Sequence, residues 1–304
     1  MSRAAALHKP ILKWYAEHAR DLPWRSADAS PWAVLVSEVM LQQTPVVRVQ
    51  PVWQRWMSRW PDPAALAAEA PGEAVRAWER LGYPRRAIRL HSCAQAIVDQ
   101  HHGEVPSQES TLLTLPGIGT YTAAAVAAFA FGVRTTVVDT NVRRVLARSI
   151  SGAALPAPSL TKDDTDVARQ ALPADRHDSV RWNVGVMELG ALVCTARAPR
   201  CDVCPVRDRC AWLRAGRPAY TGPAHRGQSW HGSDRQCRGA LLQRLRDHDG
   251  WLPAGEFVEA WSQNDEQRER CLAALVQEGL IRSTQIARPS HGLARAIWYG
   301  FDEG

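Results

Sequence analysis

The chain has 304 residues, of which 45% are hydrophobic and 22% charged, the balance of an ordinary globular protein with room for two or three domains. No apolar run is long enough to cross a bilayer and the N-terminus lacks a signal-type apolar core, so we expect a soluble, cytoplasmic protein without membrane contacts. The formal charge of +6 suits a polyanionic partner, and the excess lies before Arg217, since the remainder carries 11 basic and 11 acidic residues. If DNA is the partner, the first two-thirds of the chain should bind most of it.

Helical periodicity dominates the first 214 residues. Few segments alternate apolar and polar residues with a period of two, so we expect an all-α fold there. Ser30-Pro31 is a typical helix start, with serine as the N-cap and proline in the first helical position. The predicted helices cover residues 10–19, 32–43, 46–59, 64–69, 72–81, 84–100, 120–131, 141–149, 162–171 and 181–192.

The remainder of the chain predicts a linker and a small second domain. Residues 216–236 are rich in Gly, Pro, Ser, His and Arg, which is typical of a linker. Short helices at 238–246, 256–261 and 265–278 then precede a β-hairpin within 281–299. This order of three helices and a hairpin is similar to a winged-helix domain, which we assign to residues 237–304.

Four of the seven cysteines lie close together in the sequence, with the spacing C-x6-C-x2-C-x5-C. They are Cys194, Cys201, Cys204 and Cys210. Four thiolates on one short loop can hold an iron–sulfur cube, and the same soft ligands also suit zinc. Zinc knuckles usually pair two C-x2-C hooks, and this loop has one, so we favour a structural 4Fe–4S cluster. Five arginines near the cysteines suit phosphate contacts: Arg197, Arg200, Arg207, Arg209 and Arg214.

The segment Leu115-Pro116-Gly117-Ile118-Gly119 lies between two predicted helical stretches. Its two glycines allow a tight turn that leaves backbone amides at a helix N-terminus free to hold a phosphate. Taken alone, the segment could equally be a glycine-rich turn between helices. The cysteine group, about 75 residues downstream, favours a helix–hairpin–helix motif that binds DNA.

Two carboxylates have the pattern that cleavage of an N-glycosidic bond requires. Asp139 follows the buried-looking run Thr135–Val138 and precedes Thr140-Asn141 near the start of a helix, where an aspartate can also be a simple N-cap. Glu38 lies in a strongly apolar helix; it can be that helix's polar edge, but in a desolvated pocket its pKa would rise and it would hold a proton near neutral pH. The reaction needs an acid to protonate the leaving base and an anion to stabilise the oxocarbenium-like sugar. Glu38 in its apolar setting suits the acid, and Asp139 beside polar neighbours suits the anion.

Six motifs occur in an order that identifies a family. They are Asp21-Leu22-Pro23-Trp24-Arg25, residues 37–44, Leu81-Gly82-Tyr83, residues 115–121, Val138-Asp139 with Asn141, and residues 188–194. Over about residues 11–214 the chain resembles the helix–hairpin–helix glycosylases of the endonuclease III superfamily, and within it the MutY family of adenine DNA glycosylases. The resemblance implies a two-lobed all-α fold, with a six-helix barrel lobe over about 26–135 and an iron–sulfur lobe formed by about 1–25 and 136–215.

The resemblance also implies the chemistry. Glu38 matches the acid that protonates adenine N7 and later activates water, Asp139 matches the carboxylate opposing the cationic sugar, and Asn141 matches a neighbour that positions this chemistry. Tyr121 stands where bifunctional members carry a nucleophilic lysine. Since tyrosine cannot form a Schiff base, we expect a monofunctional enzyme that leaves an abasic site.

The remaining site residues follow from the same resemblance. The base pocket is implied to contain Trp24, Arg25, Leu41 and Glu188. The wedge that enters the helix opposite the target, and its neighbours, match Gln43, Thr44, Leu81 and Tyr83. The phosphate-binding hairpin matches Leu115, Gly117, Gly119 and Thr120, and the four cysteines match the ligands of the 4Fe–4S cluster. The implied partner is double-stranded DNA containing A:8-oxoG or A:G mispairs, bound by a monomer; the high Ala, Arg and Trp content indicates a bacterial protein, which would associate with the nucleoid.

Two departures from the family keep other functions open. Val184 stands where the family carries Gln or Glu that reads the adenine edge, and the segment after Gly216 is too short for the family's Nudix-like domain; Ser290-His291 matches its 8-oxoguanine loop as a dipeptide alone. Val184 leaves room for a mismatch thymine or uracil glycosylase of the same superfamily, against which the context of Glu38 with Gln42-Gln43-Thr44 argues. A non-catalytic iron–sulfur DNA-binding protein is the other alternative, and it would make Glu38, Asp139 and Tyr121 coincidental.

Overall fold

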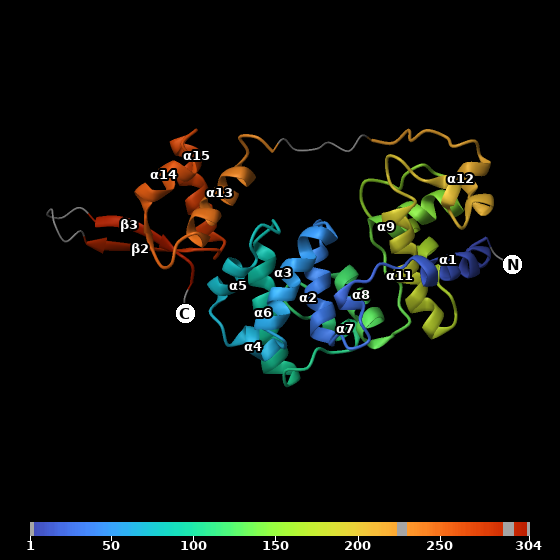
Figure 1. Cartoon of the computed structure of the whole chain (residues 1–304), viewed down its shortest axis with the longest axis horizontal. Coiled ribbons are helices and arrows are strands. Elements are labelled where there is room, and N and C mark those ends of the chain that lie inside the picture. The colour runs from blue at the N-terminus through green and yellow to red at the C-terminus, as the bar shows by residue number, and fades with distance from the viewer. Residues whose placement is uncertain (1–2, 224–229, 288–294, 303–304) are drawn as a thin grey trace. The chain divides into compact units, whose positions relative to one another are not determined.

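Figure 1 shows the chain as a computed structural model, in which residues 3–223, 230–287 and 295–302 are described. The chain forms two compact units. Unit 1 consists of Met1–Val34, Ser107–Leu113 and Ile118–Arg226. Unit 2 consists of Leu35–Pro106, Thr114–Gly117 and Gly227–Gly304.

Unit 1 is built from helices joined by short turns. In chain order they are α1 (Ala5–His18), η1 (Pro23–Arg25), the first residues of α2 (Pro31–Leu41), α7 (Glu109–Leu112), α8 (Thr120–Phe131), α9 (Thr140–Leu146), α10 (Lys162–Ala171), α11 (Arg176–Leu192), η3 (Cys201–Val203), η4 (Arg207–Arg209) and α12 (Ala211–Arg214). Leu7 and Ile11 of α1 are four residues apart and lie on one helix face, where they pack in a single core with Val142 of α9 and Val186 of α11. The long helix α11 thereby becomes the support for both α1 and α9.

Unit 2 combines a helical layer with the C-terminal region. The helical layer consists of the rest of α2, then α3 (Val46–Arg59), α4 (Pro63–Ala67), α5 (Pro71–Ala77) and α6 (Arg85–His101). Its core is rich in tryptophan, and the ring of Trp56 lies edge-on to Trp60 at 4.7 Å and to Trp78 at 5.5 Å between centroids. The indole N–H of Trp56 donates to the backbone oxygen of Ala77 at 2.9 Å, so this buried ring leaves no polar atom unsatisfied.

The C-terminal region has the element order of a winged helix. It consists of α13 (Asp234–Arg246), β1 (Leu252–Pro253), η5 (Ala254–Glu256), α14 (Phe257–Ala260), α15 (Asp265–Gln277), β2 (Arg282–Ala287) and β3 (Arg295–Gly300). The strands form an antiparallel sheet in the order β1-β3-β2, with Leu252 opposite Tyr299 and Arg282 opposite Gly300. The fold class predicted from the sequence is confirmed, including this small domain.

The C-terminal region packs against α5 of the same unit. The backbone N–H of Gly72 donates to the carbonyl of Asp302 at 3.0 Å, and a Cβ at Gly72 would overlap that backbone, so only glycine allows the contact. The guanidinium of Arg76 lies over the ring of Phe301 at 4.9 Å, and Arg246 donates to the carbonyl of Val75 at 3.1 Å. The region is therefore a docked part of unit 2, which the sequence pattern alone did not predict.

Several boundaries differ from the predicted ones. Helices α1 and α11 begin at Ala5 and Arg176, before the predicted starts at 10 and 181, and α11 begins there because Asp175 caps it. The helix predicted over 141–149 changes after Leu146 into a π-helical turn, η2 (Ala147–Ser151), in which the Ser149 hydroxyl donates to the carbonyl of Val145.

The predicted lobes and linker differ in part from the two units. Helix α8 belongs to unit 1, because its alanines pack against Val137 and Met187. Helix α13 begins at Asp234, inside the segment predicted as a linker, with Ser233 as its N-cap. Residues 224–229 of that linker and Ser290-His291 lie outside the described residues. The domain boundaries stay a prediction.

Candidate functional site

Asp139 is fixed at the start of α9 by donors from that helix. Its Oδ1 accepts from the backbone N–H of Val142 at 2.6 Å, and its Oδ2 accepts from Nδ2 of Asn141 at 2.7 Å. The other side of the Asn141 amide accepts from Nη2 of Arg144 at 2.7 Å. Arg144 thereby orients Asn141, and Asn141 orients the carboxylate. The structure thus joins two predicted site residues with one, Arg144, that sequence reasoning missed.

The electrostatics of Asp139 differ from the polar setting that the sequence predicts. Burial raises the pKa of Asp139, whereas the hydrogen bonds from Val142 and Asn141 and the charge of Arg144 lower it, and the net direction is upward. These donors therefore favour the ionised form, against the effect of burial. A carboxylate that is desolvated yet held by fixed donors stabilises a nearby cation more strongly than one in water.

Removal of the Asn141 amide should shift the pH dependence of the reaction. If turnover requires ionised Asp139, the rate falls as the pH falls through its pKa. The bond from Asn141 lowers that pKa, so Asn141→Ala is expected to move the acid limb of the single-turnover rate to a higher pH. The matched control Asn264→Ala, which removes the N-cap of α15, should leave the limb in place. An unmoved acid limb in Asn141→Ala would contradict the role of this bond.

The segment around Asn141 packs tightly against α11. A Cβ added to Gly190 would lie 2.6 Å from Cβ of Asn141, so this crossing of α9 and α11 requires glycine. Nη2 of Arg144 also donates to the carbonyl of Gly190 at 2.7 Å, and Nε donates to the carbonyl of Cys194 at 2.7 Å. The same arginine thus links Asp139 to the beginning of the cysteine loop.

Glu188 is fully buried and holds two arginines. Its Oε1 accepts from Nε of Arg20 at 2.6 Å, and its Oε2 accepts from Nη2 of Arg20 at 2.8 Å and from Nη2 of Arg25 at 2.9 Å. Both oxygens are engaged by the two arginines and the side chain is 0% exposed, and the place of Glu188 in the base pocket stays a prediction. Glu188 thereby fixes Arg25, whose Nη1 is buried and, among the described residues, has no hydrogen-bond partner. Trp24, the neighbour of Arg25 in η1, is buried.

The Glu188 network should make the protein sensitive to acid. Burial, the largest influence, raises the pKa of Glu188, but the hydrogen bonds and charges of Arg20 and Arg25 together lower it to about 2, from an ordinary 4.5. Because the folded-state pKa is depressed, the stabilisation is complete above about pH 4.5 and is lost as the pH falls toward 2.

We expect the free energy of unfolding of the wild type to lose on the order of 3 kcal/mol over this range from Glu188. When unfolding by urea is measured over the same pH range, Glu188→Gln should not show this loss of unfolding free energy. In Glu256→Gln, which removes a surface partner of Arg244, the acid dependence should stay that of the wild type. Equal acid dependence in Glu188→Gln and the wild type would contradict the assignment.

Glu38 lies in unit 2 on α2, among buried apolar neighbours. It is 5% exposed, while Leu35, Val36 and Met40 are fully buried. Its burial rules out the surface polar edge that the sequence left open. Leu41, predicted for the base pocket, is the half-buried last residue of α2. Glu38 and Asp139 belong to different units, so their convergence on one nucleotide stays a prediction.

The loops carrying Gln43 and Tyr83 are tied together by the buried Arg86. Its Nη1 donates to the carbonyls of Val39 at 2.8 Å, Met40 at 3.0 Å and Gln42 at 2.7 Å, which are at the C-terminal end of α2. Its Nη2 donates to Oγ1 of Thr44 at 3.0 Å and to the carbonyl of Gly82 at 2.9 Å. Burial lowers the pKa of Arg86 to about 10, which still leaves it charged at neutral pH.

Both loops adopt backbone conformations that side chains rarely occupy. Gln43 has φ 55° and Tyr83 has φ 49°, in the left-handed region, and both side chains are exposed. Thr44 and Leu81 are buried, and the Thr44 hydroxyl donates to the carbonyl of Leu81 at 3.1 Å, so this pair links the two loops. Their predicted contact with DNA stays a prediction.

The two glycines of the predicted phosphate-binding hairpin differ in backbone conformation and in surroundings. Gly117 has φ 77° and lies against Arg89, where a Cβ would come within 2.7 Å of that side chain, so glycine is required. Gly119 is extended, with open space around it, and is the N-cap of α8. Leu115 is buried and anchors the segment, whereas Thr120 is exposed at the first position of α8. Tyr121 packs against the alanine cluster of that helix.

The cysteine loop is held by Arg148, a second organising residue that the sequence did not reveal. Nη1 of Arg148 lies 3.3 Å from Sγ of Cys194 and donates to the carbonyl of Thr195 at 2.8 Å, and Nη2 donates to the carbonyl of Ala196 at 3.0 Å. A guanidinium beside a sulfur favours the thiolate, which is the form that binds metal.

The geometry of the donor set separates a cluster from a single zinc ion. After burial, the nearby sulfurs of Cys194, Cys210 and Cys201 raise the pKa of Cys204, which shows that the four thiols lie near one another. Among the described residues, which include all four, no three of these sulfurs lie within 4.8 Å of one another. Sulfurs around one tetrahedral zinc ion lie about 3.8 Å apart. The wider arrangement fits the larger iron–sulfur cube.

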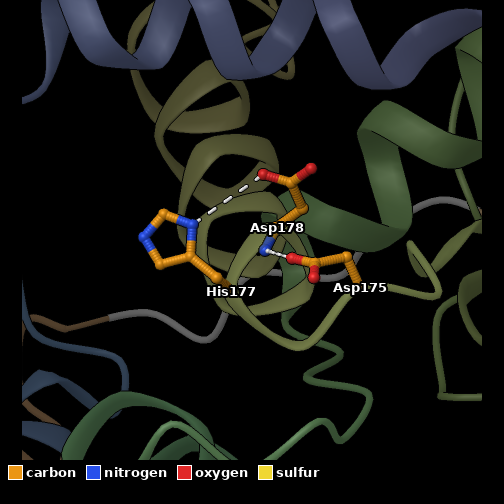
Figure 2. A group of neighbouring side chains, drawn as sticks. All are labelled: Asp175, His177 and Asp178. Atoms are coloured by element: carbon orange, nitrogen blue, oxygen red, sulfur yellow. Dashed lines mark hydrogen bonds and ion pairs between the residues drawn. The ribbon is translucent and has the colours of Figure 1, made fainter.

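Figure 2 shows a group at the start of α11, formed by the exposed Asp175 and His177 and the half-buried Asp178. Oδ1 of Asp175 accepts from the backbone N–H of Asp178 at 2.8 Å, and Nδ1 of His177 lies 4.0 Å from Oδ1 of Asp178. Helix capping accounts for this group.

Comparisons with known proteins decide the family. The model of the HhH-GPD superfamily base excision DNA repair protein matches residues 36–168, and that of the iron-sulfur binding domain of endonuclease III matches residues 194–210. The adenine DNA glycosylase of Mycobacterium tuberculosis (strain ATCC 25618 / H37Rv) is 49% identical over 286 residues, which cover 93% of this chain and 93% of the relative. The adenine DNA glycosylase of Mycolicibacterium smegmatis is 49% identical over 278 residues, covering 91% of this chain and 93% of the relative.

The chain belongs to the adenine DNA glycosylase family. The resemblance stated from its motifs is confirmed, as is the prediction of an iron–sulfur cofactor. A solved structure of a thermostable thymine-DNA glycosylase is also similar, with a TM-score of 0.63 and 26% identity over 70% of this chain and 97% of that chain. Within the described residues, no helix is long and apolar enough to span a membrane.

Proposed function

We propose that the protein is a monofunctional adenine DNA glycosylase of base excision repair, which hydrolyses the N-glycosidic bond of adenine opposite 8-oxoguanine or guanine. The observation that supports this most directly is the geometry of Asp139, a desolvated carboxylate held by Val142 and Asn141. It occurs in a chain that is 49% identical to two adenine DNA glycosylases over more than nine-tenths of its length.

In the proposed reaction, two carboxyl groups act in opposite protonation states. Glu38, which is buried on α2, acts as the acid and donates a proton to the base. The glycosidic bond then breaks, the base leaves as neutral adenine, and Asp139 stabilises the cationic sugar until water adds to it. Glu38 accepts the proton that this water loses. Tyr121 cannot replace water as a Schiff-base nucleophile, so the strand stays intact.

Arg25 is proposed to orient the flipped base. Glu188 fixes its guanidinium, and the buried Nη1 is a donor without an acceptor among the described residues. A ring nitrogen of the base can supply that acceptor. A hydrogen bond formed only when the base is in place would favour base flipping, since an unsatisfied buried donor costs about 1–3 kcal/mol.

The cysteine loop is proposed to hold a 4Fe–4S cluster with a structural role. Cys194, Cys201, Cys204 and Cys210 would be its ligands, and Arg144 and Arg148 support the loop from α9 and η2. When bound, the cluster supplies a rigid core for a loop with little regular structure.

The last part of the proposal concerns the contacts with the mispaired DNA, the oligomeric state and the cellular location. Exposed Gln43 and Tyr83 are proposed to enter the base stack opposite the target nucleotide. We further propose a monomer that acts on double-stranded DNA in the bacterial cytoplasm, in association with the nucleoid.

A panel of otherwise identical duplexes tests the function. We expect release of adenine opposite 8-oxoguanine and opposite guanine, no release opposite thymine, and strands that break only after alkali treatment. A thymine opposite guanine belongs in the same panel, because Val184 and the similarity to a thymine-DNA glycosylase favour that substrate as the second candidate. Release of thymine without release of adenine would replace the proposed activity with the second one.

A further inference from the structure

Unit 2 contains a large cavity between the Gln43 and Tyr83 loops and the C-terminal region. Its volume is about 1300 Å³, and it is lined by residues 42–43 and 79–86 on one side and by Trp230 and much of α13 on the other. The residues proposed to enter DNA therefore share a cavity with a domain whose role neither the motifs nor the proposed function explains.

The lining of this cavity is strongly basic. It contains nine arginines against four acidic residues, Glu79, Asp234, Asp247 and Glu278. Six of the arginines are engaged by the protein: Arg80 with Gln243, Arg86 with the two loops, Arg85 and Arg238 with Glu278, Arg244 with Glu256, and Arg246 with Val75. Arg48, Arg89 and Arg235 are exposed and, within the described part of the chain, none has a hydrogen bond or ion pair. Three unneutralised guanidinium groups around one cavity, two on the helical layer and one on α13, form a site for phosphates.

Arg235 is the cation among these three that belongs to the C-terminal region, and it lies against Tyr83. Its guanidinium carbon is 5.5 Å from the centroid of the Tyr83 ring, and that of Arg86 is 5.6 Å from the same centroid. Tyr83 is 44% exposed and in a left-handed conformation fixed by its loop. If Tyr83 enters the DNA as proposed, Arg235, which is stacked on it, lies beside the backbone of the strand that Tyr83 enters.

The charge of the other helices argues for α13 as the DNA-facing element of this domain. In helix-turn-helix modules the second helix of the pair usually enters the groove, which here would be α15. That helix begins with Asp265 and Glu266, and its Arg268 and Arg270 are paired with Asp265 and Asp234. Two acidic residues at its N-terminus repel phosphates, so α15 is poorly suited to that role.

We propose that the C-terminal region forms one wall of the DNA-binding groove, and that Arg235 contacts a backbone phosphate of the strand opposite the target adenine. This inference rests on the proposed function. It also refines the expectation that DNA binding is confined to the first two-thirds of the chain: the C-terminal region is neutral as a whole, but α13 presents an unpaired cation to the cavity.

The test measures binding by the full-length protein at several salt concentrations. The probes are a duplex with 2′-fluorinated deoxyadenosine, which resists cleavage, opposite 8-oxoguanine, and the same duplex with that nucleotide opposite thymine. For Arg235→Ala we expect affinity for both duplexes to fall roughly tenfold near 0.1 M salt, and the slope of log K against log salt to shrink by about 1. Arg235→Lys should restore the slope. The control Arg282→Ala removes an exposed arginine of the same region that pairs with Asp302 outside the cavity, and it should bind as the wild type does.

Each outcome separates this inference from the proposed function. Wild-type affinity and salt slope in Arg235→Ala would overturn the inference and leave the glycosylase activity standing. A loss confined to the duplex with 8-oxoguanine would overturn the phosphate assignment, because a backbone contact is independent of the base. Failure of the wild type to release adenine from any duplex would refute the proposed function, while the salt slopes would still decide whether Arg235 contacts DNA.

Discussion

Asp139→Asn is expected to reduce the single-turnover rate of adenine release by roughly 100-fold or more while leaving DNA affinity unchanged. The substitution keeps the size of the side chain, and its carbonyl oxygen can still accept from Val142 as the helix cap. What it removes is the negative charge beside the developing oxocarbenium ion. A 100-fold loss corresponds to about 2.7 kcal/mol of transition-state stabilisation.

The chain offers a matched control for the alternative that Asp139 is only a helix cap. Asp175 caps α11 with the same geometry, its Oδ1 accepting from Asp178 at 2.8 Å. Asp139→Asn and the control Asp175→Asn should each lower the free energy of unfolding by about 1 kcal/mol or less, since each changes one helix cap. Only Asp139→Asn should affect base release. Near-normal rates in that variant would leave Asp139 with the capping role alone.

The convergence of Glu38 and Asp139 can be tested with a double-mutant cycle. Residues that act in one transition state give non-additive losses, because after the first is removed the second has less to stabilise. We therefore expect Glu38→Gln with Asp139→Asn to lose much less rate than the product of the two single losses. Multiplicative losses would indicate that the two carboxyl groups act independently.

Motifs in the sequence identify candidate site residues, but they do not identify the residues that hold those candidates in place. Gln43, Tyr83 and Asp139 stand in motifs, so their roles could be proposed from the residues alone. Arg86, Arg144 and Arg148 lie in helices whose sequence pattern makes an arginine look like a solvated surface residue. Their importance arises from carbonyls that are far away in sequence, for example Val39 for Arg86 and Cys194 for Arg144. Tertiary contacts of this kind leave no local pattern.

Glu188 stands in a motif, but the motif does not reveal which groups its carboxylate contacts. Its place in the run before Cys194 associated it with the base pocket, but the motif does not tell whether a carboxylate faces the ligand or the protein. The structure shows it saturated by Arg20 and Arg25. The docking of the C-terminal region on α5 was equally hidden, because it depends on the absence of a Cβ at Gly72 and on a backbone contact with Asp302.

Arg86→Lys is expected to lower the free energy of unfolding by about 3–5 kcal/mol or more, as typically happens when the contacts of a buried charge with several hydrogen bonds are broken. Arginine presents a planar fork that reaches carbonyls of α2 and the loop of Gly82 together, whereas a lysine ammonium can satisfy only a few of them. Each buried carbonyl left unpaired costs about 1–3 kcal/mol. The adjacent Arg85→Lys is the matched control: Arg85 is exposed, with its Nε 3.9 Å from Glu278, and the substitution should change stability by less than about 0.5 kcal/mol.

Arg86→Lys should also weaken recognition of the mispaired duplex. Without Arg86, Gln43 and Tyr83 are free to leave left-handed conformations that cost on the order of 1 kcal/mol or more each. Any folded Arg86→Lys protein should therefore lose much of its preference for the mispaired duplex over a fully paired one, while its affinity for the paired duplex, which depends on phosphate contacts, changes little. Urea unfolding gives the stability and competition binding gives the preference. A variant that matched Arg85→Lys in both measurements would show that the two loops are organised without Arg86.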